Sequence, residues 1–330
     1  MKIKILHHQK YFGQSLPTFK SMDLNLLETS LQKLGFSTSL ISFEELQSEV
    51  PSNDTFYLCG SHQNLDVKSY LDDVLDLECF ENKIIPNRRL VKAHENKGFQ
   101  GVLAKALGLP YEEQLYFIEP QSLNETKVIK LVNGAGSGGV KLCNNNKELK
   151  AFLFKALALK LGVKRLAYFL RAKFNSVRKI NYHKEALSYY TPKEKYITQD
   201  FVAGLTCDFK VLVFMNKLFV LKRNTKKGDF RASGSGLFDF IDAPNDMLEF
   251  AFQFRKELDT PYVSMDIIEK GNGYSCIEYQ CVHFGPYTQM EAEHYYLFDN
   301  NTWLKKHNNT KLEPLIADSL YLFLKCKKVV

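Results

Sequence analysis

Residues 264–280 read SMDIIEKGNGYSCIEYQ. Apolar and polar residues alternate on both sides of Gly271-Asn272-Gly273, a pattern typical of two antiparallel strands joined by a glycine turn. If the turn is centred on Asn272, Asp266 lies directly opposite Glu278, and alternation puts Gln280 on the same face as Glu278. The stretch therefore predicts a β-hairpin that brings two carboxylates together.

Two carboxylates that face each other on a half-buried hairpin repel, which destabilises the fold unless a cation lies between them. Ligands that offer only oxygen suit Mg²⁺ or Mn²⁺, and an amide oxygen can complete such a set. We therefore predict a metal site formed by Asp266, Glu278 and Gln280. The alternative is an exposed hairpin that carries two solvated acids.

Residues 134–139, GAGSGG, follow a predicted strand at 127–132. Glycines free backbone N–H groups to wrap a phosphate. The candidates for phosphate contact are Gly134, Gly136, Ser137, Gly138 and Gly139. A dinucleotide site would need a helix directly after the glycines and an acid about 20 residues further on, but residues 140–143 look like a strand and residues 152–160 hold no acid. What remains is a glycine-rich hairpin over phosphates, or a flexible surface hairpin.

Cationic residues occur at strand positions in the same half of the chain. They are Lys130 before the glycine loop, Lys210 two residues after Asp208, and further along Arg223 and Arg231. Each alone is typical of a solvated face. Together with a glycine loop and a carboxylate pair, they fit ATP-dependent phosphoryl chemistry.

The first 85 residues alternate between strand and helix, with strands at 2–7, 38–43 and 55–59 and a helix at 24–34. This alternation predicts a small α/β domain with a parallel sheet. A single helix carrying Lys92, Lys97 and Lys105 is expected to follow and to end at residues 108–110, after which the sequence is rich in strands.

From Asn87 to Pro286 the chain resembles the ATP-grasp superfamily, near the branch of ribosomal-protein glutamate ligases, glutathione synthetases and D-alanine ligases. The matching segments are Lys97 ahead of 108–110, Lys130 with the glycine loop, 197–204, 208–210, Arg223 with 229–236, and 265–266 with 277–280. The resemblance implies a fold of the α/β and α+β classes: a pre-ATP-grasp α/β domain over 1–86, then a two-lobed ATP-grasp domain with lobes over 87–200 and 201–330.

The resemblance also implies roles for single residues. Lys97 and Lys130 contact ATP phosphates, Asp208 belongs to the nucleotide site, and the adenine-binding hinge consists of Gln199, Asp200, Phe201 and Val202. Asp266, Glu278 and Gln280 hold Mg²⁺. The catalytic candidates are Lys210, Arg223 and Arg231, and either arginine steadies an acyl phosphate. The family usually has Asn where Gln280 stands and often has Arg where Lys210 stands.

The activity implied is that of an ADP-forming ligase that joins a small-molecule carboxylate to an amine. A kinase of the same fold and a non-catalytic nucleotide-binding protein are the alternatives. Residues 278–286 look like ATP-grasp proteins associated with surface-polysaccharide genes, so a role in glycan modification is a further expectation.

Charge is unevenly distributed along the 330 residues. The whole chain has a net charge of +7. Residues 141–195 alone have 14 Lys and Arg against three Glu, a local charge of +11. This predicts an anionic partner, and we favour an anionic acceptor substrate over a membrane surface and exclude a nucleic acid. No apolar stretch approaches about 18 residues and the seven cysteines include no C-x-x-C, so a cytoplasmic protein is expected.

Overall fold

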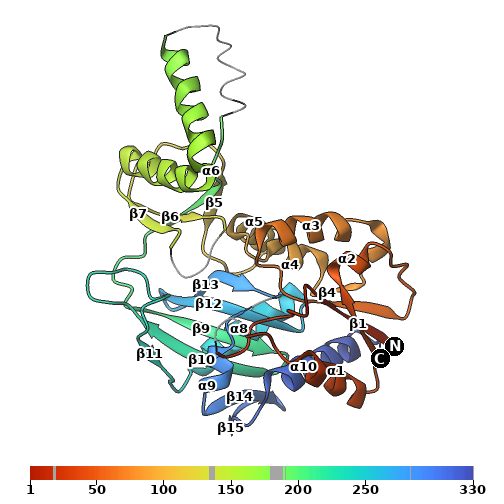
Figure 1. Ribbon diagram of the computed structural model, residues 1–330. Helices are drawn as coiled ribbons and strands as arrows, with labels where there is room; N and C mark the ends of the chain where they lie inside the picture. Colours follow the sequence, from red (N-terminus) through yellow and green to blue (C-terminus); the bar gives the residue numbers. More distant parts are fainter. Residues whose placement is uncertain (18–19, 134–137, 179–188, 190, 283, 330) are drawn as a thin grey trace. The chain divides into compact units, whose positions relative to one another are not determined.

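A computed structural model describes residues 1–17, 20–133, 138–178, 189, 191–282 and 284–329 (Figure 1). The chain folds into two compact units. The first consists of Met1–Glu112 and Gly204–Val330, and the second of Glu113–Ala203. The domain boundaries expected after residues 86 and 200 stay a prediction.

The first unit begins with a parallel sheet, as the alternation of strand and helix predicts. Its strand order is β2-β1-β3-β4. The strands are β1 (Lys2–His7), β2 (Ser37–Ser42), β3 (Thr55–Cys59) and β4 (Ile84–Ile85). The helices of this segment are α1 (Leu24–Lys33), α2 (Phe43–Leu46), α3 (Leu65–Leu75) and the 3-10 turn η1 (Glu78–Phe80).

The first unit also holds a larger antiparallel sheet, ordered β13-β12-β9-β10-β14-β15, with β11 beside β10. Its strands are β9 (Cys207–Phe214), β10 (Lys217–Asn224), β11 (Phe238–Asp239), β12 (Tyr262–Lys270), β13 (Gly273–Gln280), β14 (His294–Asp299) and β15 (Thr302–His307). The helices are α8 (Asn245–Leu258), α9 (Tyr287–Glu291) and α10 (Leu312–Cys326).

Apolar packing joins the two sheets into one unit. Helices α1 and α10 lie side by side (Figure 1), and one buried cluster runs from Ile3 and Leu27 through Leu320 to Phe214 on β9. A second cluster packs Met247 and other residues of α8 under β9 and β12. Both ends of the chain therefore contribute to the same core, which explains why they form a single unit.

The helix expected to carry Lys92, Lys97 and Lys105 is in fact two helices, α4 (Arg88–Ala93) and α5 (Lys97–Leu107). The chain turns between them because Glu95 has a φ of 49° and Asn96 caps α5 by accepting a hydrogen bond from the backbone N–H of Phe99. Neither glycine nor proline marks the break. As a consequence Lys97 is the first residue of α5 instead of an internal one.

The second unit has an antiparallel sheet ordered β5-β8-β6-β7 and one long helix. Its elements are β5 (Gln114–Phe117), β6 (Lys127–Leu131), β7 (Val140–Cys143), α6 (Asn146–Val177) and β8 (Tyr196–Asp200). Strands β6 and β7 form the predicted hairpin, with Lys130 paired to Val140. Helix α6 bends at Gly162, whose φ of 66° and ψ of 167° are not helical. Among the helices described, none is long and apolar enough to cross a bilayer.

The hairpin of β12 and β13 pairs Asp266 with Glu278 as predicted, by a different route. Lys270 pairs with Gly273, so the turn consists of two residues and is not centred on Asn272. This register alone would place Ile277 opposite Asp266. A bulge after Asp266 restores the pairing, because Ile267 pairs with Cys276 while Asp266 pairs with Glu278. Without the bulge, Glu278 would lie on the face of Cys276, which belongs to the apolar core.

The turn at Gly271 can be tested by a matched pair of substitutions. Gly271 has a φ of 60°, whereas Gly273 has no left-handed backbone, and a Cβ at either position would meet no neighbour. We expect Gly271→Ala to lower the free energy of unfolding by about 1–2 kcal/mol, because an L-residue is strained there. Gly273→Ala should change it by less than about 0.5 kcal/mol. Urea unfolding measures both, and equal effects would contradict the turn.

Candidate functional site

Six of the predicted site residues lie on one face of the larger sheet in the first unit. Asp208 and Lys210 belong to β9, and Arg223 of the neighbouring strand β10 is paired with Asp208. Asp266 of β12 is paired with both Lys210 and Glu278. Gln280 follows Glu278 at the same face by alternation. Four neighbouring strands therefore gather these side chains, which are spread along the sequence from Asp208 to Gln280.

Asp266 is held between two cations. Its Oδ1 lies 2.9 Å from Lys210 Nζ, and its Oδ2 lies 2.9 Å from Arg223 Nη2. Burial alone would raise the pKa of Asp266, but Arg223 and Lys210 outweigh burial and hold it below its usual range. The carboxylate is therefore charged at neutral pH.

Arg223 also holds Asp208, so that its guanidinium bridges two buried carboxylates. Its Nε and Nη2 donate to the two carboxylate oxygens of Asp208 over 2.6 and 2.8 Å. Burial raises the pKa of Asp208, with Arg223 opposing that rise. The planar guanidinium of arginine can donate to two carboxylates at the same time. The single ammonium group of a lysine cannot reproduce this geometry.

Glu278 has its own cation, Lys97. The Lys97 Nζ lies 3.3 Å from Glu278 Oε1, and the two side chains are 6% and 25% exposed. The break between α4 and α5 places Lys97 at the start of α5, from where its side chain reaches this pair. The cations between the facing carboxylates thus come from the chain itself: Lys97, Lys210 and Arg223 balance Asp208, Asp266 and Glu278.

Gln280 is oriented by neighbours that sequence reasoning missed. Its Oε1 lies 2.8 Å from His94 Nδ1 and accepts from the backbone N–H of Glu95 over 3.4 Å. Its Nε2 donates to Glu278 Oε1 over 3.4 Å. The N–H of Glu95 requires an oxygen, and the Glu278 carboxylate requires a donor, so both neighbours fix the same amide orientation. His94 therefore donates through Nδ1, and the amide oxygen expected to bind a metal points to His94 and Glu95.

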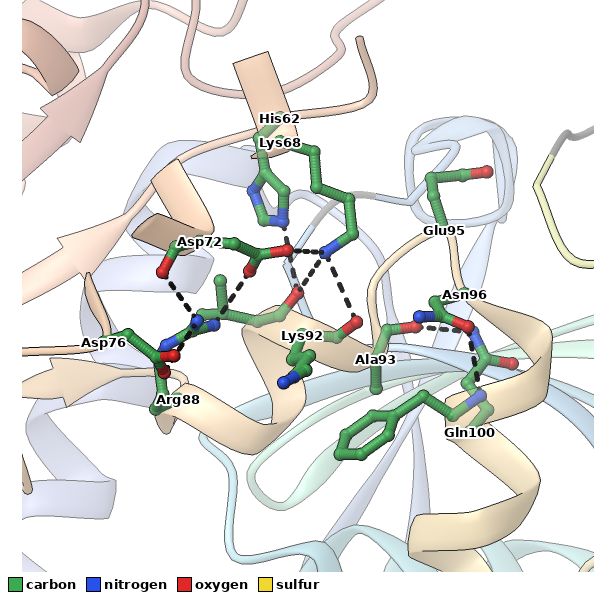
Figure 2. Close-up of polar contacts among 12 residues, drawn as sticks. His62, Lys68, Asp72, Asp76, Arg88, Lys92, Ala93, Glu95, Asn96 and Gln100 are labelled. Carbon is green, nitrogen blue, oxygen red and sulfur yellow. Dashed lines mark hydrogen bonds and ion pairs between the residues drawn. The ribbon is translucent and has the colours of Figure 1, made fainter. Parts of the chain in front are cut away.

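A polar network holds the end of α4 that carries His94 (Figure 2). The His62 ring lies 4.6 Å from the His94 ring, and its Nε2 is 3.2 Å from the carbonyl of Val91. Burial, together with the charge of Lys68, lowers the pKa of His62 to about 4. Lys68 in turn donates to the carbonyl oxygens of Val91 and Lys92.

The same network ties α4 to α3. Arg88 pairs with Asp72 over 2.9 Å and with Asp76 over 3.2 Å, and Lys68 pairs with Asp72 (Figure 2). Gln100 of α5 donates to the last carbonyl of α4, that of Ala93, over 3.1 Å. The turn between the two helices is therefore fixed from both sides. Asn96 as a helix cap is the one sequence signal that could have located this turn.

Arg231 pairs within its own loop. Its Nη2 lies 2.8 Å from Asp229 Oδ2, and the side-chain hydrogen bonds lower the pKa of Asp229 to about 2. Its predicted contact with an acyl phosphate remains a prediction, as does that of Arg223.

The remaining nucleotide candidates belong to the second unit. Lys130 and Gln199 are buried on β6 and β8, and Gln199 Nε2 donates to Gln114 Oε1 over 3.3 Å. Asp200 pairs with Lys127, and after the end of β8 Phe201 is exposed while Val202 is half-buried. Gly138 and Gly139 precede β7, and Gly134, Gly136 and Ser137 lie outside the described residues.

The face of the sheet fits a magnesium ion that arrives with phosphates. Asp266 and Glu278 oppose each other and offer only oxygen, which suits Mg²⁺. Ser264, two residues before Asp266 on the same face, has a buried hydroxyl without a hydrogen-bond partner. Within the described part of the chain, no three of His, Cys, Asp and Glu gather as a metal site. The donor set that fits a metal ion here is therefore the pair of carboxylates together with phosphate oxygens of a bound ligand.

Comparison with solved structures identifies the fold. No protein-family model and no curated protein matches the chain. The structure of D-cycloserine synthetase DcsG is similar over 98% of this chain and 100% of its own, with 11% identity and a TM-score of 0.54. The ATP-grasp ligase PsnB in complex with a minimal precursor is similar over 97% and 98%, with 13% identity and a TM-score of 0.52.

A third similar structure is the RimK domain protein of ATP-grasp type from Sphaerobacter thermophilus. It covers 97% of this chain and 99% of its own, with 10% identity and a TM-score of 0.50. These likenesses span nearly the whole chain. The protein therefore has the ATP-grasp fold, and the fold expected from the sequence is confirmed.

The charge balance predicts how the metal-free protein responds when one carboxylate is removed. Glu278→Ala should lower the free energy of unfolding by about 1–3 kcal/mol, because buried Lys97 loses its carboxylate. Relief of repulsion between Glu278 and Asp266 would instead raise it. Glu269→Ala, an exposed acid on β12, is the control and should stay within about 0.5 kcal/mol. A Glu278→Ala protein more stable than the wild type in urea would refute the balance.

Proposed function

We propose that the protein is an ATP-dependent ligase that joins a carboxylate to an amine with release of ADP. The observation that supports it is the face of the sheet on an ATP-grasp fold, where Asp266 opposes Glu278 among three cations. Phosphoryl transfer needs cations on the transferred group and positioning more than a side-chain nucleophile. This face offers charges of both signs and fixed geometry.

In the proposed reaction, a carboxylate oxygen of the substrate attacks the γ-phosphorus of ATP, and the bond to the β-phosphate oxygen breaks. The products of this step are an acyl phosphate and ADP. An amine then attacks the acyl carbon and displaces inorganic phosphate, which leaves an amide. A bound Mg²⁺ would neutralise charge on the phosphates.

The roles of single residues follow from their positions. Lys210, which already pairs with an anionic oxygen of Asp266, can pair with a phosphate oxygen instead, and so can Lys97. We propose that Lys130 contacts the phosphates too, and that residues 199–202 contact adenine. Asp266 and Glu278 are the proposed metal ligands. Gln280 is the proposed third ligand, and its amide oxygen must leave its hydrogen bond with His94 to bind the metal.

We further propose that an anionic substrate supplies the carboxylate or the amine. Support comes from the resemblance of residues 278–286 to ATP-grasp proteins associated with surface-polysaccharide genes. A cell-surface glycan carrying a uronic acid has the chemistry required.

The neutral site predicts that metal binding depends on nucleotide. Mg²⁺ or Mn²⁺ alone would add two positive charges to a cluster that its own residues already balance, whereas the triphosphate supplies compensating negative charge. We expect Mn²⁺ affinity to rise at least about tenfold, or 1.4 kcal/mol, when a non-hydrolysable ATP analogue is present. Electron paramagnetic resonance of free Mn²⁺ measures this, and equal affinity with and without the analogue would contradict it.

A screen of ADP release over pairs of carboxylates and amines tests the proposed activity. A ligase releases ADP in quantity only when both substrates are present. ADP release with one substrate and a stable phosphorylated product would identify a kinase, and binding of Mg·ATP without release across the screen would indicate a non-catalytic protein. In an active pair, Glu278→Gln should reduce turnover by at least about 100-fold, while Glu269→Gln should leave it within about twofold.

A further inference from the structure

The half of α6 that follows Gly162 exposes large apolar side chains. Val163 is 87% exposed, Phe174 55% and Val177 82%, and Leu170 is 49% exposed. The apolar core described for this unit takes Leu149, Leu153 and the partly buried Phe152 from α6, all before Gly162. Figure 1 shows the second half of the helix running away from the sheet of its own unit. These apolar side chains therefore do not serve the fold of the unit.

The exposed apolar residues form one stripe. Val163, Leu170, Phe174 and Val177, together with the half-buried Leu166, are spaced by three or four residues, which places them on a single side of a helix. At 100° per residue, Lys164, Arg171 and Arg178 fall along one edge of this stripe and Lys173 along the other. The Arg178 guanidinium lies 4.3 Å from the Phe174 ring centroid. The stripe thus combines exposed apolar groups with cations on both edges.

The partner of the stripe must meet two requirements at once. It has to cover apolar side chains, and it has to be negatively charged. A soluble anionic sugar meets only the second. A second copy of the helix meets only the first, because no Asp or Glu occurs between Glu148 and Glu185 and the basic edges would face each other. An anionic bilayer meets both, with an apolar layer directly beneath charged headgroups.

We propose that the stripe lies in the headgroup region of an anionic membrane and anchors the protein there. Residues 163–177 form a helical segment about 22 Å long, which suits a helix lying flat in the interface. The charges would attract anionic lipid, and the apolar residues would enter the boundary of the acyl chains. The exposed apolar side chains favour a membrane over the anionic substrate that we expected from the sequence. The sequence analysis rested on charge alone, which does not show that these apolar residues are exposed. The inference goes beyond the proposed ligase activity and stands without it.

Vesicle sedimentation of the full chain tests the proposal. We expect the wild type to sediment with vesicles of phosphatidylcholine and phosphatidylserine and to stay in solution with phosphatidylcholine alone. Lys164→Gln/Arg171→Gln/Lys173→Gln should weaken partitioning about 100-fold, at about fivefold per charge. Leu170→Gln/Phe174→Gln/Val177→Gln should weaken it at least as much without any change in charge. The matched control Lys147→Gln/Lys150→Gln/Lys155→Gln removes three charges before Gly162 and should retain binding within about fivefold.

Three outcomes would overturn the proposal. One is no binding of the wild type to anionic vesicles at low salt. Another is an apolar variant that binds as well as the wild type, since a soluble anion, with polyglucuronate as the probe, would then be the favoured partner. The last is a dimer in lipid-free solution that the apolar substitutions dissociate. Circular dichroism of each variant checks folding. We expect all variants to fold, because no residue of the stripe belongs to the apolar core described for this unit.

Discussion

The arrangement depends on charge balance among side chains that are buried or half-buried on one face of the larger sheet. Asp208, Asp266 and Glu278 can lie together on one face of a sheet only because Arg223, Lys210 and Lys97 lie against them. Unpaired, each buried charge would cost several kcal/mol. Two local features of the site contribute to this balance. A bulge turns Glu278 away from the core, and the break after α4 brings Lys97 to Glu278.

The same balance links the resting protein to its proposed chemistry. Lys97 and Lys210 each pair with a carboxylate oxygen. In the proposed reaction phosphate oxygens would take the place of these oxygens, and the released carboxylates would be the proposed ligands of a magnesium ion. The two regions of the protein therefore differ in net charge. The site is neutral, whereas the excess of positive charge lies on residues 141–195, where α6 exposes it beside apolar side chains.

Strand alternation and glycine turns are local signals, so the sequence could predict the parallel α/β sheet and the facing carboxylates, while the rest of the fold was implied by the resemblance of the motifs to the ATP-grasp superfamily. Asp266 and Glu278 were paired correctly although the turn is one residue shorter than expected, since the bulge adds that residue back. The partners of the carboxylates could not be predicted: Lys97 reaches Glu278 through a helix break without glycine or proline, and His94 reaches Gln280 across 186 residues. Such contacts arise from tertiary packing and leave no spacing in the sequence.

A crystal structure with Mg²⁺ and a non-hydrolysable ATP analogue tests the central claim most directly. The claim predicts a metal ion bound by Asp266, Glu278 and phosphate oxygens, with the Lys97 Nζ moved from Glu278 to a phosphate. Arg223 should still bridge Asp208 and Asp266. Nucleotide bound with its metal ion away from these two carboxylates, or with the Lys97–Glu278 pair intact, would contradict the claim that protein cations and ligand exchange places at this site.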